Sequence, residues 1–312
     1  MSKTLVFIFP GQGSQFVGMA ADLAADFPVV AATLAEANET LGLDLAQIMG
    51  EGPAEALTAT ENAQPALLTH SVALTRVLAE AGVEPSLVAG HSLGEYSALV
   101  AAGALSFPAA LQLVRARGLA MATAGATAGG AMAAIIGLDD AAVEQAVSEA
   151  AQEGLVVVAN YNSPGQVVIS GEAAAVARAG ELAKAAGARG ALPLKVSGAF
   201  HSPLMAPAAA ELAPVLEAAP LNDARVPVVS NIDAEPRQAA AELREALARQ
   251  ITGSVRWTES VRRMIAAGGE CFVEVGPGDV LTKLMKRIDP EATALSTSTT
   301  AGVRAALASL AE

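Results

Sequence analysis

A serine held between two glycines is the residue of this chain best placed to do chemistry. Ser92 follows a short apolar run at residues 87–89 and precedes a segment rich in alanine and leucine. A buried strand, a tight turn and a helix in this order form a nucleophile elbow, which exposes the serine hydroxyl above the end of the strand. Gly90 and Gly94 let the backbone turn sharply and let the helix approach the strand. The pattern predicts a catalytic nucleophile; the alternative is an ordinary strand-to-helix turn with an inert serine.

A serine nucleophile needs a base, and histidine is the usual base near neutral pH. The chain has only three histidines. His70 lies in a predicted helix at residues 66–81, and His91 adjoins the serine on a turn where neighbouring side chains point apart. His201 lies on a loop that Pro203 ends, so we predict that it is the base, with a capping or loop histidine as the alternative. The sequence alone does not name the group that orients this histidine.

Arg117 indicates what the substrate carries. In a predicted helix at residues 107–121, it falls inside the apolar stripe of the helix. A buried guanidinium needs an anion, and its planar fork matches a carboxylate. The anion is either an internal Asp or Glu or part of the substrate, and snorkelling to the surface is a further alternative. If the anion belongs to the substrate, the substrate is an acyl group with a carboxylate.

Gln12 lies on a loop that could take part in the same chemistry. The segment at residues 9–15, FPGQGSQ, directly follows the first predicted strand. Ligand sites form at the carboxyl ends of parallel strands. The loop lacks the GxxxxGK[ST] pattern of a phosphate loop. The backbone N–H of Gln12 could donate to an oxyanion, and an ordinary polar turn is the alternative.

The composition narrows the classes of function. A chain of 312 residues can bury a large core without disulfides, and its single cysteine, Cys271, suits a reducing cytosol. The net charge of −13 argues against binding to nucleic acid. The uncharged stretch at residues 118–138 contains too many glycines for a membrane helix, and no secretory signal is visible. We therefore expect a cytoplasmic protein that binds neither nucleic acid nor a membrane.

Continuous apolar runs and alanine-rich segments alternate along much of the chain. The apolar runs predict buried strands at residues 5–9, 87–89, 226–230 and 271–275. The alanine-rich segments predict helices at residues 19–26, 29–41 and 66–81. This alternation is typical of a parallel sheet covered by helices.

A segment in the middle of the chain has a different rhythm. Its strands and helices are predicted at residues 131–136, 139–153, 155–159, 167–170, 172–186 and 191–195. Their order is βαββαβ, the ferredoxin-like arrangement. The Gly/Thr-rich run at 123–130 and the pair Ser197–Gly198 are expected to be flexible junctions. We predict an α/β protein with a hydrolase-like large domain, residues 1–128 and 198–312, and an inserted ferredoxin-like subdomain, residues 129–197.

Taken together, these features resemble the malonyl-CoA:acyl-carrier-protein transacylase family of fatty-acid synthesis and, more broadly, the acyltransferase domains of polyketide synthases. The resemblance is carried by FPGQGSQ at 9–15, GHSLGE at 90–95, Arg117, NYNSPGQ at 160–166, GAFHSPLM at 198–205, Gln250 and EVGPG at 274–278. The motifs cover nearly the whole chain in order and spacing, so they are far more specific together than any one alone. The family's fold is a hydrolase-like domain with a ferredoxin-like insertion, in agreement with the prediction above.

The resemblance implies a role for each matching residue. Ser92 would be the nucleophile and His201 the base. The backbone N–H groups of Gln12 and Leu93 would form the oxyanion hole. Arg117 would clamp the carboxylate of a malonyl group.

Gln250 would orient the histidine through a main-chain or side-chain oxygen, which explains why no acid is found. Leu93 and Phe200 match the malonyl-selective pattern, and Phe200 would crowd an α-methyl branch. The residues assigned to substrate binding are Arg117, Phe200, Met121, Asn162 and His91.

The reaction that the resemblance implies is ping-pong acyl transfer. Malonyl-CoA would load Ser92, coenzyme A would leave, and the phosphopantetheine thiol of acyl carrier protein would take the malonyl group. We expect no tightly bound cofactor, no metal, and a free-standing enzyme that is a monomer. The alternatives are a serine esterase or thioesterase, a polyketide-type acyltransferase, and a non-catalytic relative that serves as a scaffold.

Docking of the carrier protein needs a local basic patch. Acyl carrier proteins are generally acidic, and this chain is itself strongly negative, so overall charge cannot attract them. The candidate docking residues are Lys283, Lys286 and Arg287, with Arg189 and Lys195 near the second junction. A solvated helix face is the alternative.

Overall fold

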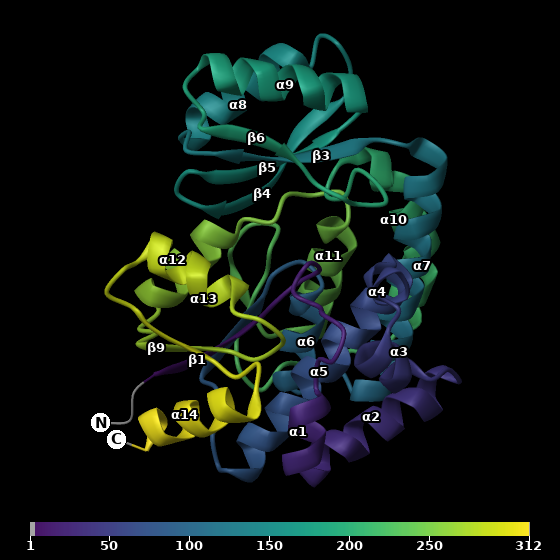
Figure 1. The fold of residues 1–312 in the computed structure, drawn as a ribbon, viewed down its shortest axis with the longest axis vertical. Helices are drawn as coiled ribbons and strands as arrows, with labels where there is room; N and C mark the ends of the chain where they lie inside the picture. The colour runs from purple at the N-terminus through teal and green to yellow at the C-terminus, as the bar shows by residue number, and fades with distance from the viewer. Residues whose placement is uncertain (1–3, 312) are drawn as a thin grey trace.

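The chain folds around two separate sheets (Figure 1). The computed structural model describes residues 4–311; residues 1–3 and 312, which fall within the expected bounds of the large domain, lie outside the described residues. Sheet A has six strands in the order β10-β9-β1-β2-β7-β8, and sheet B has four in the order β4-β5-β3-β6. Figure 1 shows sheet B, with α8 and α9, above the rest of the molecule. The prediction of a parallel α/β fold with an inserted second sheet is confirmed.

Sheet A is parallel except at one edge, where β7 and β8 are antiparallel. Its strands are β1 (Leu5–Phe9), β2 (Leu87–Gly90), β7 (Val228–Val229), β8 (Pro236–Arg237), β9 (Cys271–Glu274) and β10 (Thr293–Ser296). In β1, Phe7 and Phe9 join one hydrophobic cluster while Val6 and Ile8 join another. Since successive side chains of a strand point to opposite faces, β1 is buried on both sides and needs apolar residues throughout.

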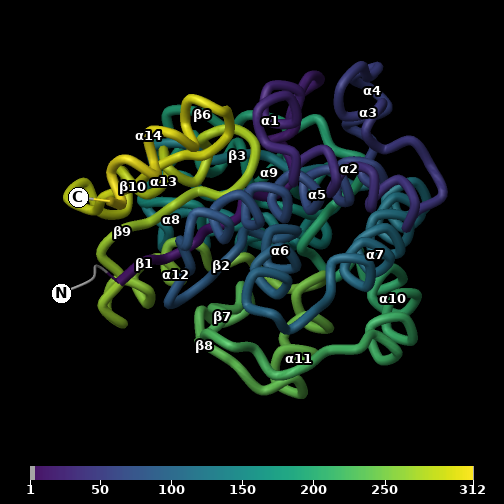
Figure 2. Tube along the Cα trace, turned by 90° about the horizontal axis from the view of Figure 1, so that it is seen from below, coloured from purple at the N-terminus to yellow at the C-terminus, as the bar shows by residue number. Residues whose placement is uncertain are grey.

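Helices pack on both faces of sheet A. In the first half of the chain they are α1 (Ala21–Asp26), α2 (Pro28–Leu41), α3 (Leu45–Glu51), α4 (Ala54–Thr58), α5 (Thr60–Glu80), α6 (Gly94–Ala101) and α7 (Phe107–Ala128). In the second half they are the 3₁₀ turn η1 (Pro203–Met205) and helices α10 (Ala206–Ala218), α11 (Ala240–Gln250), α12 (Trp257–Ala266), α13 (Val280–Ile288) and α14 (Thr300–Leu310). Figure 2 shows α10 beside α7, with α13 and α14 beside β9 and β10 at the opposite side of the molecule.

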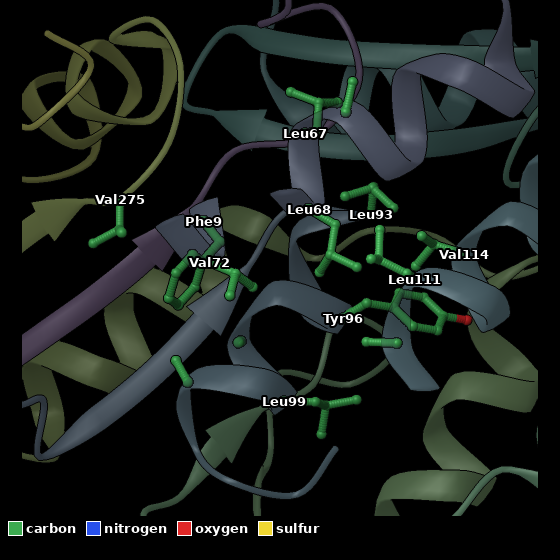
Figure 3. Close-up of a cluster of buried hydrophobic side chains, with 14 of the residues drawn as sticks. Phe9, Leu67, Leu68, Val72, Leu93, Tyr96, Leu99, Leu111, Val114 and Val275 are labelled. Atoms are coloured by element: carbon green, nitrogen blue, oxygen red, sulfur yellow. The ribbon is translucent and has the colours of Figure 1, made fainter. Parts of the chain in front are cut away.

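The core that supports the elbow is formed by α5, α6 and α7 against β1. Figure 3 shows the converging side chains, which include Phe9, Leu67, Leu68, Val72, Leu93, Tyr96, Leu99, Leu111, Val114 and Val275. Gly118 of α7 permits the close approach of α5, because a Cβ there would lie 2.7 Å from the Cα of Glu61.

Sheet B is antiparallel throughout. Its elements are β3 (Ala131–Ile136), α8 (Asp140–Ala150), β4 (Val156–Ser163), β5 (Gln166–Gly171), α9 (Ala173–Ala185) and β6 (Gly190–Pro193). Both helices cover the outer face of the sheet (Figure 1) and share a separate hydrophobic cluster with it. The strand order agrees with the predicted ferredoxin-like arrangement. We propose the domain division at residues 128/129 and 197/198 on the basis of this second sheet.

Several of the predicted boundaries are wrong: the helix predicted at 66–81 begins at Thr60, and the strand predicted at 155–159 continues to Ser163. The run at residues 123–130 was expected to be a flexible junction, but α7 continues to Ala128. A Cβ on Gly125 would lie 2.2 Å from the carbonyl oxygen of Ser197, so this glycine permits a close contact with the returning chain rather than flexibility. The strand predicted at residues 226–230 is only two residues long, β7 at Val228–Val229; Pro227, just before it, has no N–H to give to a ladder.

The parallel strands bring three loops together at one edge of sheet A. Phe9 pairs with Gly90, and Ala89 pairs with Val229, so β1, β2 and β7 end side by side. The loops that follow them carry Gln12, Ser92 and Asn231.

Candidate active site

Ser92 lies on a strained turn directly after β2. Its φ of +50° is in the left-handed region, which costs a residue other than glycine about 1–3 kcal/mol. A Cβ on Gly90 would lie 1.9 Å from the carbonyl carbon of Gly94, and one on Gly94 would lie 2.1 Å from the carbonyl oxygen of Phe9. The turn therefore requires both glycines.

Asn231 holds this turn from the loop after β7. Its side-chain oxygen accepts a hydrogen bond from the N–H of Ser92 at 2.7 Å, and its side-chain amide donates to the carbonyl oxygen of Gly90 at 2.6 Å. These two bonds satisfy the backbone on both sides of the elbow and offset its strain.

His201 lies beside the Ser92 hydroxyl. Its Nε2 is 2.8 Å from Oγ of Ser92, while Nδ1 is 3.1 Å from the carbonyl oxygen of Gln250 and 3.0 Å from that of Gly253. Because carbonyl oxygens can only accept, Nδ1 carries the proton and Nε2 presents a lone pair to the serine. The arrangement can deprotonate Ser92 without a carboxylate.

The electrostatic surroundings keep this imidazole neutral. Burial, together with the positive charge of Arg117 and the nearby His91, lowers the pKa of His201 to about 3. The neutral form is the one that can accept the serine proton, so the base is available across the physiological pH range.

Arg117 reaches the same hydroxyl from α7. The side chain is 1% exposed, and its Nη2 donates to Oγ of Ser92 at 3.2 Å and to Oε1 of Gln250 at 3.0 Å. Its Nη1 donates to Oε1 of Gln64 at 2.8 Å, and its guanidinium lies 5.4 Å from the centre of the Tyr96 ring. Within residues 4–311 all these hydrogen-bond partners are uncharged, so the direct internal ion pair considered from the sequence does not form. A buried cation with neutral partners is suited to receive an external carboxylate.

A single cavity of about 350 Å³ contains most of the predicted site residues. These are Gln12, His91, Ser92, Leu93, Arg117, Met121, Asn162, Lys195, Phe200 and His201. Met132, Asn160 and Val168 of sheet B line its other side, so the cavity lies between the two sheets. Gln250 is buried beside the cavity and contributes through its hydrogen bonds.

His91 connects the elbow to sheet B. Its Nε2 lies 2.8 Å from the side-chain oxygen of Asn162 on β4, and its ring centre lies 5.7 Å from that of Trp257. Burial lowers the pKa of His91, which favours its neutral form. His91 thus both supports the turn and forms part of the cavity wall.

Two residues that line the cavity have a backbone N–H without a partner among the described residues. In the described part of the chain, neither the N–H of Gln12 nor that of Leu93 donates a hydrogen bond. Both residues line the cavity, and Leu93 stands at the start of α6. The side chain of Gln12 is held by a hydrogen bond of 3.2 Å to the hydroxyl of Thr60. These amides are free to receive a ligand oxygen, as an oxyanion hole requires.

The predicted docking residues occupy different surroundings. Lys195 lines the cavity. Lys283 forms an ion pair with Asp279 at 2.7 Å, and Arg287 donates to Oε1 of Gln166 at 2.5 Å, whereas Lys286 is exposed.

Arg189 lies beside the end of β3 and is not among the residues that line the cavity. Its side chain packs at Gly137, whose N–H donates to the carbonyl oxygen of Gly165 at 2.7 Å. Gly165 adjoins Gln166, so Arg189 and Arg287 lie near the same turn between β4 and β5.

Several residues of the site were not predicted from the sequence. They are Gln64, Glu95, Asn231 and Gly253. A charged residue at the start of a helix buried as completely as α6 was an available signal for Glu95. The backbone carbonyl of Gly253 gave no such signal, since every residue has a carbonyl group.

Among residues 4–311, no cluster of His, Cys, Asp and Glu could hold a metal ion. No described helix is both long and apolar enough to cross a membrane.

Residues 6–305 match the model of the acyl transferase domain family. The malonyl CoA-acyl carrier protein transacylase of Escherichia coli (strain K12) is 52% identical over 96% of this chain and 98% of its own length. The protein of the same name from Bacillus subtilis is 48% identical over 100% of this chain and 98% of its own length.

Solved structures share the fold as well. A malonyl-transacylase in complex with a type II PKS acyl-carrier protein is 50% identical, with a TM-score of 0.95 over 99% of this chain and 100% of its own. The malonyl CoA-acyl carrier protein transacylase of Coxiella burnetii is 42% identical, with a TM-score of 0.97 over 100% of this chain and 99% of its own.

Proposed function

Because the chain belongs to the acyl transferase domain family, we propose that it transfers a malonyl group from malonyl-CoA to the phosphopantetheine thiol of acyl carrier protein. This is the step that supplies malonyl groups to fatty-acid synthesis, and it proceeds through a malonyl ester on Ser92. The relatives named above carry this activity in their names, and one of them was solved with its carrier protein.

One observation supports the proposal more than any other. The guanidinium of Arg117 is buried in the same cavity as the nucleophile and donates to the Ser92 hydroxyl itself. A carboxylate bound at Arg117 therefore lies a short distance from the reacting oxygen. A malonyl thioester has its carboxylate one carbon from the carbonyl that Ser92 attacks, so the spacing suits it.

The first half of the reaction is acylation. His201 takes the proton of Ser92 through Nε2 as Oγ attacks the thioester carbonyl. The backbone N–H groups of Gln12 and Leu93 receive the oxyanion. The carbon–sulfur bond breaks, the proton on His201 passes to the sulfur, and coenzyme A leaves the malonyl ester behind.

The second half reverses these steps with a different thiol. The phosphopantetheine thiol of the carrier gives its proton to His201 and attacks the ester, and Ser92 recovers its proton as the thioester forms. The carboxylate fixed at Arg117 holds the ester in one orientation, which favours the thiol over water.

Intact-mass measurement tests this proposal. The protein is mixed separately with malonyl-, methylmalonyl- and acetyl-CoA, and the covalent adduct is measured before and after the carrier protein is added. We expect a malonyl adduct that persists until carrier is present. Release of malonate to water at the same rate without carrier would instead identify a thioesterase, and the lack of any adduct would identify a non-catalytic relative.

Replacement of Arg117 by Ala is expected to act on malonyl transfer alone. The charge-assisted pair with a carboxylate is worth about 1.5–3 kcal/mol, which corresponds to a loss of roughly 10- to 150-fold in kcat/KM for malonyl-CoA. Acetyl-CoA lacks the carboxylate, so its use should be unchanged or raised. The two rates are compared in the loading assay.

Arg115→Ala is the matched control for Arg117→Ala. Arg115 lies on the same helix but donates to the carbonyl oxygen of Glu61 and the side chain of Asn62, at 2.6 and 2.7 Å. Its removal should not change the ratio between the two substrates. Equal losses for malonyl- and acetyl-CoA in Arg117→Ala would show that this residue is structural.

Carrier docking is proposed at the exposed cations of α13, with Lys286 as the first to test. Lys286 is exposed and takes part in no described ion pair, unlike Lys283. Lys286→Glu is expected to raise the KM for the carrier protein several-fold, because it places a like charge before an acidic partner. Loading of Ser92 by malonyl-CoA should not change.

Lys184→Glu serves as the control for that charge reversal. Lys184 is an exposed residue of α9, on the outer side of sheet B. The KM of this variant for the carrier protein should match that of the unmodified protein. If both reversals act alike, or neither acts, the docking surface does not include Lys286.

A further inference from the structure

Glu95 is a buried carboxylate for which the proposed acyl transfer has no use. It lies in the first turn of α6, three residues after the nucleophile, and is 1% exposed. Its Oε2 accepts two hydrogen bonds, from Nε2 of Gln250 at 2.7 Å and from the N–H of Asn231 at 3.1 Å. Burial of a charged carboxylate is costly unless an opposite charge compensates it.

The opposite charge is Arg117, but an amide separates the two groups. Gln250 donates to Glu95 through Nε2 and accepts from Nη2 of Arg117 through Oε1, at 2.7 and 3.0 Å. Burial raises the pKa of Glu95, which the positive charge of Arg117 opposes, and burial lowers the pKa of Arg117, which the negative charge of Glu95 opposes. Glu95 therefore compensates the charge of Arg117 through the side-chain amide of Gln250, and it forms no direct hydrogen bond with the guanidinium.

This separation keeps Arg117 available on the cavity side. Its Nη2 donates to the Ser92 hydroxyl, and among the described residues its Nε has no hydrogen-bond partner. A carboxylate that enters the cavity meets a cation whose charge a second carboxylate already balances. Two carboxylates that share one buried site disfavour each other's ionisation.

We propose that Glu95 is the resident counter-ion of Arg117 and that it takes up a proton when the carboxylate of the acyl group binds there. This inference rests on the proposed function, because it takes a malonyl group as the incoming anion. The proton comes from solvent and forms an O–H bond on Glu95, while the substrate stays ionised. Glu95 does not touch the reacting atoms; it acts through Gln250 and Arg117 as a positioning residue.

Glu95 is able to exchange a proton near neutral pH. Burial raises its pKa to about 7, against the opposing effects of its hydrogen bonds and of Arg117. The other charged or titratable groups that act on it are Tyr96 on the same helix and Arg237 on β8. Both arginines stay protonated, and the pKa of Tyr96 is raised to about 12. Among these groups only Glu95 changes charge between about pH 6 and about pH 9.

The direction of the pH effect follows from this. Below the pKa of Glu95 the proton is already present, and the malonyl carboxylate binds to Arg117 without competition. Above that pKa Glu95 is ionised, so binding must also drive the uptake of a proton. If the incoming carboxylate raises the pKa of Glu95 by about one unit, malonyl use falls by about tenfold relative to acetyl use.

The test measures kcat/KM for the loading of Ser92 by malonyl-CoA and by acetyl-CoA, on the full chain, from about pH 6 to about pH 9. The ratio of the two cancels the titration of coenzyme A and of the catalytic base. Acetyl-CoA is also measured as a competitor of malonyl-CoA, which gives its affinity if it loads slowly. We expect the malonyl-to-acetyl ratio to fall by about tenfold with rising pH.

Glu95→Gln separates charge from hydrogen bonding. Both donors to Glu95 reach the same oxygen, so the amide oxygen of a glutamine can accept both of them. The ratio should then be independent of pH. Glu242→Gln is the matched control, since Glu242 is an exposed acid on α11, the helix that carries Gln250. The fall in the ratio should persist in that variant.

The outcomes distinguish this inference from the proposed function. A malonyl adduct on Ser92 together with a ratio that does not change with pH in the unmodified protein overturns the role of Glu95 and leaves the function standing. A fall in the ratio that persists in Glu95→Gln also overturns it. No malonyl adduct at any pH overturns both. If Glu95→Gln does not fold, the profile of the unmodified protein decides the question.

Discussion

Ser92→Ala is expected to abolish the loading of malonyl groups. Without the hydroxyl no ester can form, and a covalent mechanism loses on the order of 10⁴-fold or more when its nucleophile is removed. Ser92 is the described serine whose hydroxyl is 2.8 Å from the Nε2 of His201. Intact mass after incubation with malonyl-CoA should show only the unmodified chain.

Ser97→Ala is the control for this substitution. Ser97 lies on α6, the helix that follows the turn at Ser92; it is buried, and its hydroxyl has no hydrogen-bond partner among the described residues. It should load as the unmodified protein does. A malonyl adduct on Ser92→Ala, at the level of the control, would contradict the assignment of the nucleophile.

His201→Ala is expected to slow the acylation of Ser92 by ~10²–10⁴-fold, the usual contribution of a general base. The serine keeps its proton in this variant, because the neighbouring Arg117 can only donate to it. Rapid quenching and mass measurement give the rate of the first turnover. A loss of only a few-fold, in a variant that unfolds at the same temperature as the parent, would point to another base.

The pH profile of the unmodified protein provides a second test of His201. Since the pKa of His201 is lowered to about 3 by burial and by the charge of Arg117, the base stays neutral on acidification. Acetyl loading, which does not involve the carboxylate, should therefore not decline between about pH 8 and about pH 5. A decline centred near pH 6.5, the ordinary pKa of histidine, would show that the imidazole is more exposed to solvent than this geometry implies.

The local features of the site could be predicted from the sequence because they depend on short-range geometry. Few backbone paths are possible at Ser92, because a strand precedes it and glycines lie two residues before and two residues after it. The structure has the expected turn. Arg117 was found from helical periodicity, since burial on one face of a helix repeats with its turn. The scarcity of histidines reduced the search for the base to three residues.

Element order also followed from local pattern. The strands of sheet A are continuous apolar runs without alternating polar residues, which is the pattern of strands buried on both faces. The βαββαβ order of sheet B could be predicted from the spacing of its segments. The prediction of a flexible junction at 123–130 was wrong because glycine can have either of two roles in a backbone. It can loosen a backbone or allow a close contact, and only the neighbour at Ser197 shows that Gly125 does the second.

Tertiary structure alone decided how the groups of the site are connected. His201 is oriented by two main-chain carbonyls, and no residue type announces a carbonyl that every residue possesses. The turn at Ser92 is held by Asn231, 139 positions away in the chain. Arg117 was predicted to need an anion, yet the nearest compensating charge, Glu95, acts across the amide of Gln250. Sequence periodicity determines which face of an element is buried, whereas the partners that meet there depend on how distant elements pack against one another.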